Sequence, residues 1–374
     1  MKSRADLKKV GCCVIKIGSA VLTDNGQGLN HTAINDWVKQ VSELKSRGVD
    51  VIIVSSGSVA EGMVRLGWQS RPHALHQLQA AASVGQMGLI QAYEQSFQAQ
   101  GFKTAQVLLT HDDLSNRTRY LNARATIKTL LSLSVVPIIN ENDVVANDEL
   151  RVGDNDTLAA IIANLIEADL LMILTDQEGF FDADPRVNSA AKLLGLASVS
   201  DSSLDLAAGG SSGVLGRGGM QTKLTAARMA ARSGAATMIV PGLRSRVILD
   251  SIEGCAVGTL LVPDEAPVSA RKRWLSAQLD VKGSLVLDTG AVTALKKSGV
   301  SLLSIGVLAV TGEFNRGDLV VCVAEDGRAL ARGLVNYASA DVAVIKRRNS
   351  SEIEALLDFV AEPELIHRDN LVLL

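Results

Sequence analysis

Two lysines, each in a glycine-containing segment, are the side chains best suited to chemistry on a phosphate group. Lys16 begins the segment KIGSA, and Lys223 ends the segment GRGGMQTK. Transfer of a phosphoryl group leaves negative charge on its oxygens, and positioned cations stabilise that charge. Two ammonium groups at one phosphate would also repel each other, so we expect a carboxylate between them. Asp156, in the segment VGDND, is the best-placed candidate.

The glycine-rich segment before Lys223 follows neither standard phosphate-binding pattern. The nucleotide P-loop needs G-x-x-x-x-G-K-[ST] and the dinucleotide fingerprint needs G-x-G-x-x-G, and residues 216–223 fit neither. We therefore expect a different kind of phosphate site, in which the glycines present backbone N–H groups and the lysine supplies charge.

Four further segments combine small, polar and acidic residues: SSGSVAEG (55–62), NENDVV (140–145), VGDND (152–156) and TDQEG (175–179). Taken singly, each is typical of a turn or a helix N-cap, which is the commonest role for Ser56 or Asp154 at such a place. Their combination favours a site for an anionic, multiply hydrogen-bonded ligand, such as a nucleotide together with a small polar acid.

Six apolar segments are expected to form the strands that position these residues: 10–17, 49–56, 104–110, 135–139, 170–175 and 236–241. Continuous apolar runs that alternate with helical patterns are typical of a mostly parallel sheet covered by helices on both faces. Ligands of such sheets bind beyond the carboxyl ends of the strands, where the polar segments lie. The sequence therefore predicts an α/β, three-layer sandwich.

The pattern changes near residue 262. The segment VPDEAPVSARKRW (262–274) carries two prolines and mixed charge, which is typical of a linker. After it, GSLVLD, SLLSIGVLAV, DLVVCVA and VAVIK are predicted to be short strands. We predict a catalytic domain at residues 1–262, a linker at 263–280, a small, mainly β domain at 281–360 and a C-terminal tail at 361–374.

The sequence predicts neither a nucleic-acid site nor a metal site. The chain of 374 residues has a net charge of −3, and residues 281–374 contain 10 Lys and Arg against 12 Asp and Glu. Contacts to nucleic-acid phosphates need a positive surface, so nucleic-acid binding is not expected. His73 and His76 have a spacing that could bind a metal, but the sequence shows no third ligand, so no metal site is predicted.

The apolar segments predict neither a signal peptide nor a membrane span. The first run is broken at Lys16 after six residues, and the longest stretch, Leu158 to Leu174, contains Asn164 and two acidic residues. We expect that stretch to form a buried helix followed by a buried strand. Four cysteines without C-x-x-C spacing suit a reducing compartment, so the predicted location is the cytoplasm.

The ordered segments KIGSA, SSG, NEND, GDND, TDQEG and GRGGMQTK resemble the amino-acid kinase superfamily. Within it, INENDVVA, VGDND, LLMILTDQEG and GGMQTK are similar to the motifs of the glutamate 5-kinases, and the C-terminal part resembles a PUA domain. The likeness runs from about Val10 to the C-terminus. It implies the amino-acid kinase fold and transfer of the γ-phosphate of ATP to the side-chain carboxylate of L-glutamate. The product would be L-glutamyl 5-phosphate, in the first step of proline biosynthesis.

The resemblance also implies a role for each polar segment. Lys16 and Lys223 would contact the transferring phosphate from opposite sides, with Asp156 orienting both, as the catalytic residues. Glutamate would be bound by Ser56, Asp143 and Asn155, with Asp143 facing its α-ammonium group. The nucleotide would be bound by Lys16, Gly18, Ser19, Thr175, Asp176, Arg217, Gly218, Gly219, Met220, Gln221, Thr222 and Lys223.

Partners also follow from the resemblance: ATP as substrate, with Mg²⁺ held mainly through its phosphates, a homo-oligomer, proline as feedback inhibitor, and transfer of the labile product to glutamyl phosphate reductase. Arg217, Phe181 and Asp182 depart from the family pattern, which leaves details of the nucleotide pocket open. Two alternatives remain: a related kinase acting on N-acetylglutamate, aspartate or UMP, and an RNA-binding protein that uses the PUA-like domain.

Overall fold

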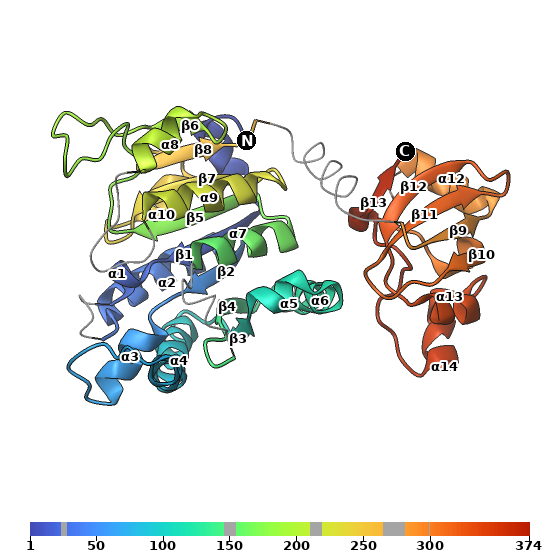
Figure 1. Cartoon of the computed structure of the whole chain (residues 1–374), viewed down its shortest axis with the longest axis horizontal. Helices are drawn as coiled ribbons and strands as arrows, with labels where there is room; N and C mark the ends of the chain where they lie inside the picture. The colour runs from blue at the N-terminus through green and yellow to red at the C-terminus, as the bar shows by residue number, and fades with distance from the viewer. Residues whose placement is uncertain (24–27, 146–154, 210–218, 265–280, 299) are drawn as a thin grey trace. The chain divides into compact units, whose positions relative to one another are not determined.

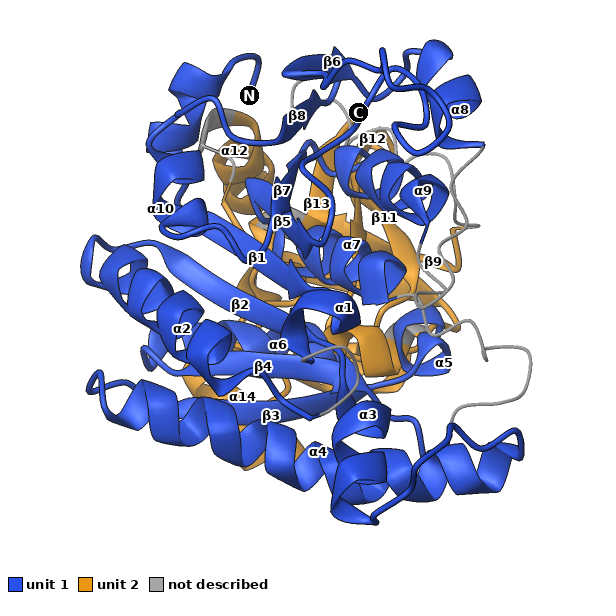
Figure 2. Cartoon of the chain, turned by 90° about the vertical axis from the view of Figure 1, so that its left-hand side faces the viewer, with its two compact units in different colours: residues 1–115, 122–270 blue, residues 116–121, 271–374 orange. Residues whose placement is uncertain are grey.

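The computed structural model describes residues 1–23, 28–145, 155–209, 219–264, 281–298 and 300–374 (Figure 1). The chain divides into two compact units, residues 1–115 with 122–270 and residues 116–121 with 271–374 (Figure 2). The boundaries predicted at 262 and 281 stay a prediction, because residues 265–280 lie outside the described part of the chain.

The first unit alternates strands and helices, and it contains all of the helix Arg117–Ser132 except residues 117–121. In chain order its elements are η1 (Arg4–Lys9), β1 (Cys12–Ile17), α1 (Ser19–Leu22), α2 (His31–Ser46), β2 (Asp50–Ser55), α3 (Ser58–Arg65), α4 (Leu75–Gln98), β3 (Thr104–Leu109), α5 (His111–Ser115), α6 (Arg117–Ser132), β4 (Val136–Glu141), α7 (Asn155–Ile166), β5 (Leu170–Thr175), β6 (Leu196–Ser198), α8 (Ser203–Ala208), α9 (Met220–Ala231), β7 (Ala236–Pro241), α10 (Val247–Ile252) and β8 (Thr259–Val262).

These strands form one eight-stranded sheet in the order β3-β4-β2-β1-β5-β7-β8-β6, in which only the β7–β8 pair is antiparallel. All six strands expected from the sequence are confirmed, and the mostly parallel sheet with them. The short strands β6 and β8 were not predicted. The carboxyl ends of β1, β2, β4 and β5 meet at one edge, as parallel pairing requires.

Helices cover both faces of this sheet, so the three-layer arrangement is confirmed. Figure 2 shows α2 and α10 on one side of the central strands and α7 and α9 on the other. All six residues of β5 are buried, which explains its unbroken apolar sequence. The apolar stretch Leu158 to Leu174 is divided between α7 and β5, as expected. None of the helices in the described ranges is long and apolar enough to span a bilayer.

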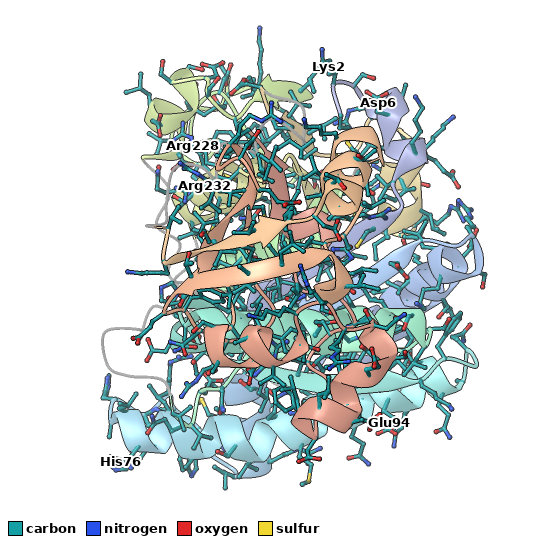
Figure 3. All side chains as sticks on the ribbon, turned by 90° about the vertical axis from the view of Figure 1, so that its right-hand side faces the viewer. Lys2, Asp6, His76, Glu94, Arg228 and Arg232 are labelled. Atoms are coloured by element: carbon teal, nitrogen blue, oxygen red, sulfur yellow. The ribbon has the colours of Figure 1, made fainter. Side chains whose placement is uncertain are left out.

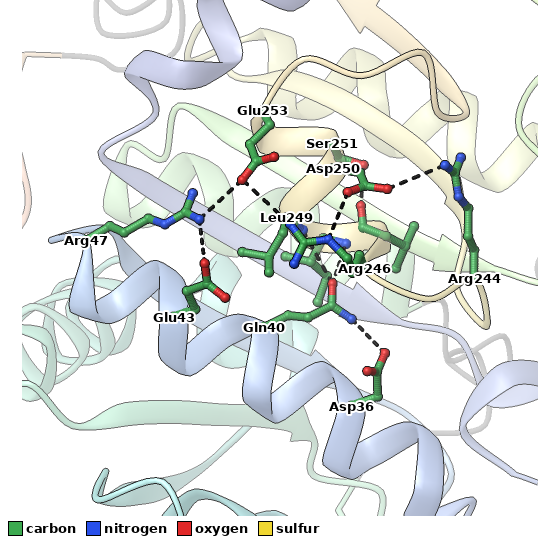
Figure 4. A network of polar contacts seen from close by, with 12 residues as sticks. Asp36, Gln40, Glu43, Arg47, Arg244, Arg246, Leu249, Asp250, Ser251 and Glu253 are labelled. Atoms are coloured by element: carbon green, nitrogen blue, oxygen red, sulfur yellow. Dashed lines mark hydrogen bonds and ion pairs between the residues drawn. The ribbon is translucent and has the colours of Figure 1, made fainter.

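A group of polar contacts joins α2 to α10 (Figure 4). Arg47 pairs with Glu43 at 2.5 Å and with Glu253 at 3.2 Å, but exposed pairs of this kind contribute only about 0–1 kcal/mol each. A buried hydrogen bond also joins the two helices. The Gln40 Oε1 atom accepts it, at 2.8 Å, from the backbone N of Ile248. This side-chain oxygen satisfies a donor at the start of α10 that has no partner within the helix.

The second unit contains a five-stranded sheet in the order β10-β9-β11-β12-β13, in which only the β9–β11 pair is parallel. Its elements are β9 (Gly283–Leu287), α12 (Thr289–Ser298), η3 (Ser304–Gly306), β10 (Val307–Gly312), β11 (Leu319–Ala324), β12 (Ala329–Leu334), α13 (Ser339–Ile345), η4 (Ser350–Glu352), α14 (Ile353–Leu357), η5 (Arg368–Asn370) and β13 (Leu371–Leu373). A core of buried apolar residues from these elements holds it together. The segment beyond residue 360 contributes β13 to the sheet.

One predicted strand of this unit is wrong, because the segment VAVIK lies in helix α13. The carboxylate of Asp341 accepts a hydrogen bond of 3.2 Å from the backbone N of Ala338, which satisfies a free donor at the helix start. Val342 and Ile345 are buried three residues apart on one face, while Val344 is 50% exposed. Burial with helical spacing therefore outweighs the strand preference of the β-branched residues.

Candidate active site

Lys16 lies near the carboxyl end of β1, which is a central strand between β2 and β5. Its side chain is only 9% exposed. A buried ammonium group is costly unless an opposite charge compensates it. The compensating group is Asp156, whose Oδ1 atom lies 2.5 Å from the Lys16 Nζ atom.

Asp156 also holds the second lysine. Asp156 is in the first turn of α7 and Lys223 is in the first turn of α9, and these helices pack against each other on one side of the sheet. The Lys223 Nζ atom lies 3.2 Å from Asp156 Oδ2, which also accepts a hydrogen bond of 3.0 Å from Thr222 Oγ1. Each lysine thus contacts a separate oxygen of one fully buried carboxylate.

The charge state of Asp156 follows from its two partners. Burial by itself would raise the pKa of this carboxyl, but Lys16 and Lys223 hold the pKa well below its usual range. Asp156 is therefore an anion at neutral pH. With both lysines protonated, the cluster carries one net positive charge at the edge of the sheet.

Gly18 leaves space beside the Lys16 ammonium group. The Gly18 backbone N donates a hydrogen bond of 3.0 Å to the carbonyl of Leu174. A Cβ at Gly18 would lie 3.1 Å from that carbonyl oxygen and 3.9 Å from Lys16 Nζ. Such a side chain would crowd the approach of any ligand to the ammonium group. Ser19, which begins α1, is exposed.

Thr175 and Asp176 lie at the end of β5, where the Thr175 hydroxyl donates a hydrogen bond of 3.0 Å to the Asp176 carboxylate. The backbone there is held by the residue that follows the neighbouring strand β7. The Thr175 carbonyl accepts a bond of 2.7 Å from Gly242 N, and the Gly242 carbonyl accepts one of 2.7 Å from Trp37 Nε1. A buried indole on α2 thus positions the end of β5.

Helix α9 points its N-terminus toward the lysine cluster, because Thr222 and Lys223 in its first turn both contact Asp156. Gly219 is the N-cap, and Met220 and Gln221 follow it. The first N–H groups of a helix have no partner within the helix and favour anions. Arg217 and Gly218 lie outside the described residues, as do residues 146–154 with Asp154.

A second polar cluster surrounds Asn155. The Asn155 Nδ2 atom lies 2.7 Å from Ser56 Oγ, 2.9 Å from the carbonyl of Ser55 and 3.2 Å from Asn140 Oδ1, and these three acceptors share its two hydrogens. Asn155 directly precedes Asp156 in α7. The Asn155 cluster therefore adjoins the lysine–aspartate cluster.

Two carboxyl groups lie at the end of β4. Asp143 accepts a hydrogen bond of 3.0 Å from Ser58 Oγ, at the start of α3. Burial raises the pKa of Asp143, although the Ser58 hydrogen bond and the charge of Arg71 act in the opposite direction. Burial and the neighbouring Asp143 raise the pKa of Glu141 to about 7. Two destabilised carboxylates at one strand end form an environment that favours a positively charged ligand group.

The structure brings six of the sixteen site residues predicted from the sequence into two adjoining clusters. Lys16, Asp156, Thr222 and Lys223 form the first, and Ser56 and Asn155 belong to the second. Asp143 follows the same strand, β4, that carries Asn140. Within the described ranges, Thr175 and Asp176 make no hydrogen bond to either cluster.

Sequence reasoning missed Asn140, which belongs to the second cluster, and Ser58, which donates a hydrogen bond to Asp143. Both belong to polar segments that the sequence singled out, SSGS and NEND, but nothing in a segment tells which polar side chain points inward. The predicted departures Phe181 and Asp182 lie in a short ladder: Phe181 bridges to Leu193, and Asp182 exchanges hydrogen bonds with Lys192.

Residues 1–23, 28–145, 155–209, 219–264, 281–298 and 300–374 contain no group of three or more His, Cys, Asp or Glu side chains arranged to hold a metal ion. His73 and His76 are both exposed, and Figure 3 shows His76 at the periphery of the molecule.

Sequence comparisons relate this chain to known proteins. The sequence profile of the amino acid kinase family matches residues 11–241, and that of the PUA domain matches residues 283–357. The chain is 57% identical over 373 residues to a glutamate 5-kinase of Thioalkalivibrio sulfidiphilus and 56% identical over 373 residues to one of Methylococcus capsulatus, with 100% of each chain covered. A glutamate 5-kinase of Pseudomonas aeruginosa is 59% identical over 360 residues, which cover 96% of this chain and 97% of that protein.

Proposed function

This chain belongs to the amino acid kinase family and, within it, to the glutamate 5-kinases, and we propose that its Lys16–Asp156–Lys223 cluster transfers the γ-phosphate of ATP to the side-chain carboxylate of L-glutamate. The observation that carries the proposal is the pair of buried ammonium groups held on one carboxylate at the carboxyl edge of the sheet. The product is L-glutamyl 5-phosphate, and ADP leaves.

The phosphoryl transfer needs positive charge at the phosphate and no general base. An oxygen of the glutamate carboxylate forms a bond to the γ-phosphorus while the bond to the β,γ-bridging oxygen breaks. The attacking carboxylate is already ionised at neutral pH, so no proton has to be removed. Lys16 and Lys223 would stabilise the charge on the transferring oxygens, because preorganised cations need no rearrangement during the reaction.

Asp156 would act on the lysines and not on the substrate. Its carboxylate is buried, has a lowered pKa and already contacts both ammonium groups. A neutral residue here would leave two like charges to repel each other and to drift apart. We therefore assign Asp156 the role of holding both lysines in place for transfer.

Glutamate would be bound by Ser56, Asp143 and Asn155. We assign Asp143 to the α-ammonium group. Burial disfavours the charged form of this carboxyl and raises its pKa, and a neighbouring cation would stabilise that charged form. The hydroxyl of Ser56 can donate a hydrogen bond to a carboxylate of glutamate, and the Oδ1 atom of Asn155 can accept one from the α-ammonium group. This pairing predicts that an acceptor without a free α-ammonium group is phosphorylated poorly.

ATP would be bound by Gly18, Ser19, Thr175, Asp176 and residues 217–223, with both lysines at its phosphates. Mg²⁺ bound to ATP would neutralise charge on the β- and γ-phosphates. As the resemblance implies, the phosphate oxygens of ATP would be its main ligands. Self-association, inhibition by proline and product transfer to glutamyl phosphate reductase stay predictions from the resemblance.

The test uses hydroxylamine to trap the acyl phosphate as a hydroxamate. The protein is incubated with Mg²⁺, ATP and L-glutamate, N-acetyl-L-glutamate or L-aspartate, and release of ADP is measured in parallel, with UMP as a further acceptor. We expect hydroxamate and ADP in equal amounts with glutamate and little of either with the other three. Equal rates with glutamate and N-acetylglutamate would contradict the role given to Asp143.

A further inference from the structure

We propose that Gln86, on helix α4, is a positioning residue for the acceptor substrate, acting through a chain of three side-chain amides: Gln86, Asn140 and Asn155. This inference rests on the proposed function, in which Asn155 contacts glutamate. Gln86 itself is separated from Asn140 by 54 residues in the sequence and is absent from every polar segment described above.

The hydrogen bonds of the amide chain run in one direction. Asn155 Nδ2 donates to Asn140 Oδ1 at 3.2 Å, and Asn140 Nδ2 donates to Gln86 Oε1 at 2.8 Å. Asn140 Oδ1 also accepts a bond of 2.9 Å from the backbone N of Glu141. Asn140 is only 2% exposed and Asn155 9%, so water competes little for these bonds.

This direction fixes which atom of Asn155 points to a ligand. The Asn155 Nδ2 atom is fully used by Ser55, Ser56 and Asn140. Its Oδ1 atom accepts no hydrogen bond in the described part of the chain and is left to accept one from a substrate. If Asn140 turned its amide over, two NH₂ groups would face each other and Asn155 would lose this orientation. The Gln86 Oε1 atom opposes that rotation, because it can only accept.

Helix α4 holds Gln86 firmly, because its neighbour Gly85 touches the backbone of α3. A Cβ at Gly85 would lie 1.8 Å from the Ser58 carbonyl oxygen, and a Cβ at Gly62 would lie 1.7 Å from the Ala81 carbonyl oxygen. No side chain fits between the two helices at these points. Ser58 in turn donates to Asp143. The packed helices α3 and α4 therefore position two residues that we assign to glutamate binding. Asp143 is held through Ser58, and Asn155 is held through Gln86 and Asn140.

The acceptor atom of Gln86 does the positioning, since its Nε2 atom is buried and makes no hydrogen bond in the described structure. Because only the Oε1 atom of Gln86 makes a hydrogen bond, two variants should behave differently. Gln86→Met has similar length and helix propensity but no acceptor, whereas Gln86→Glu keeps an oxygen that accepts from Asn140. Gln91→Met, on the exposed face of the same helix, is the matched control.

The experiment measures kcat and both KM values with the hydroxamate assay, and checks each variant's fold by circular dichroism. We expect Gln86→Met to raise the KM for glutamate about 2- to 12-fold, which is the effect of losing one neutral hydrogen bond of about 0.5–1.5 kcal/mol. The kcat and the KM for ATP should stay within about twofold of wild type. Gln86→Glu should restore the KM for glutamate, and Gln91→Met should change nothing.

Three results would overturn the proposal. The first is an unchanged KM for glutamate in Gln86→Met, and the second is a lower kcat together with an equal rise of the KM for glutamate and of the KM for ATP. The third is a Gln86→Glu variant that is as impaired as Gln86→Met. If Gln86→Met does not fold, Gln86→Ser replaces it with the same expectation. Failure of the proposed function is distinguishable, because the wild-type protein would then form no hydroxamate from glutamate.

Discussion

Replacing Asp156 by asparagine tests the charge balance on which the site depends. The variant keeps the shape of the side chain and removes its charge. Asp156 lies 2.5 Å from Lys16 Nζ and 3.2 Å from Lys223 Nζ. At an effective dielectric constant of about 20, attractions at these distances are about 5–7 kcal/mol each, before the cost of burying the charges is subtracted.

The net effect is smaller than these attractions, because the buried ions also lose their hydration. Removing one partner of a buried pair typically costs about 3–5 kcal/mol, and we expect that loss in the free energy of unfolding at pH 7.

Urea unfolding followed by circular dichroism measures the stability, and the hydroxamate assay measures kcat, which should fall about 10²- to 10³-fold. The variant that combines Asp156→Asn with Lys223→Met is the control, because it restores the original net charge of the cluster. It should recover part of the stability and none of the activity. A single variant with wild-type stability and more than half of the wild-type kcat would refute this reasoning.

Three further predictions concern the surroundings of the cluster. Asp143→Asn should raise the KM for glutamate about 10- to 150-fold, the effect of losing a charged hydrogen bond of about 1.5–3 kcal/mol, while calorimetry shows unchanged ATP affinity; an equal loss of ATP affinity would count against it. Glu141→Gln should stabilise the protein by about 1–3 kcal/mol at pH 8 and by much less at pH 5, because the carboxyl with its pKa raised to about 7 costs stability as the pH rises from its ordinary value of 4.5 through 7. Equal urea midpoints for that variant and wild type at pH 8 would show that the carboxyl is not destabilised. Trp37→Phe, which removes the donor to Gly242, should raise the KM for ATP about 2- to 12-fold and leave the KM for glutamate unchanged. A raised KM for glutamate with an unchanged KM for ATP would show that Trp37 does not act on ATP binding through Thr175.

The sequence predicts the strands of the first unit well because its buried parallel strands are continuous apolar runs. β5 and β7 have the predicted bounds. Parallel pairing then brings the ends of β1, β2 and β4 together, so residues at those ends could be predicted as neighbours without knowing any contact. The contact of Lys16 and Lys223 with Asp156 follows from this topology together with the need for a counter-ion between two cations.

Other features leave no mark in the local sequence. The segment VAVIK has the composition of a strand, and only its contacts in the second unit make it a helix. Gln86 is one of several glutamines in a long helix, and only the backbone contact of Gly85 with α3 directs it to Asn140. Asn140 itself could be named as part of NEND but not chosen over its neighbours.

The kcat of Lys223→Ala with glutamate and ATP tests the central claim most directly. Lys223 contacts Asp156 from the first turn of α9, and we propose that its ammonium group contacts the transferring phosphate. Loss of one such preorganised charge typically costs about 2.7–4 kcal/mol, so hydroxamate formation at saturating substrate should fall about 10²- to 10³-fold, with little change in the KM for glutamate. A folded Lys223→Ala protein that keeps more than half of the wild-type kcat would contradict the claim that the two lysines carry the phosphoryl transfer.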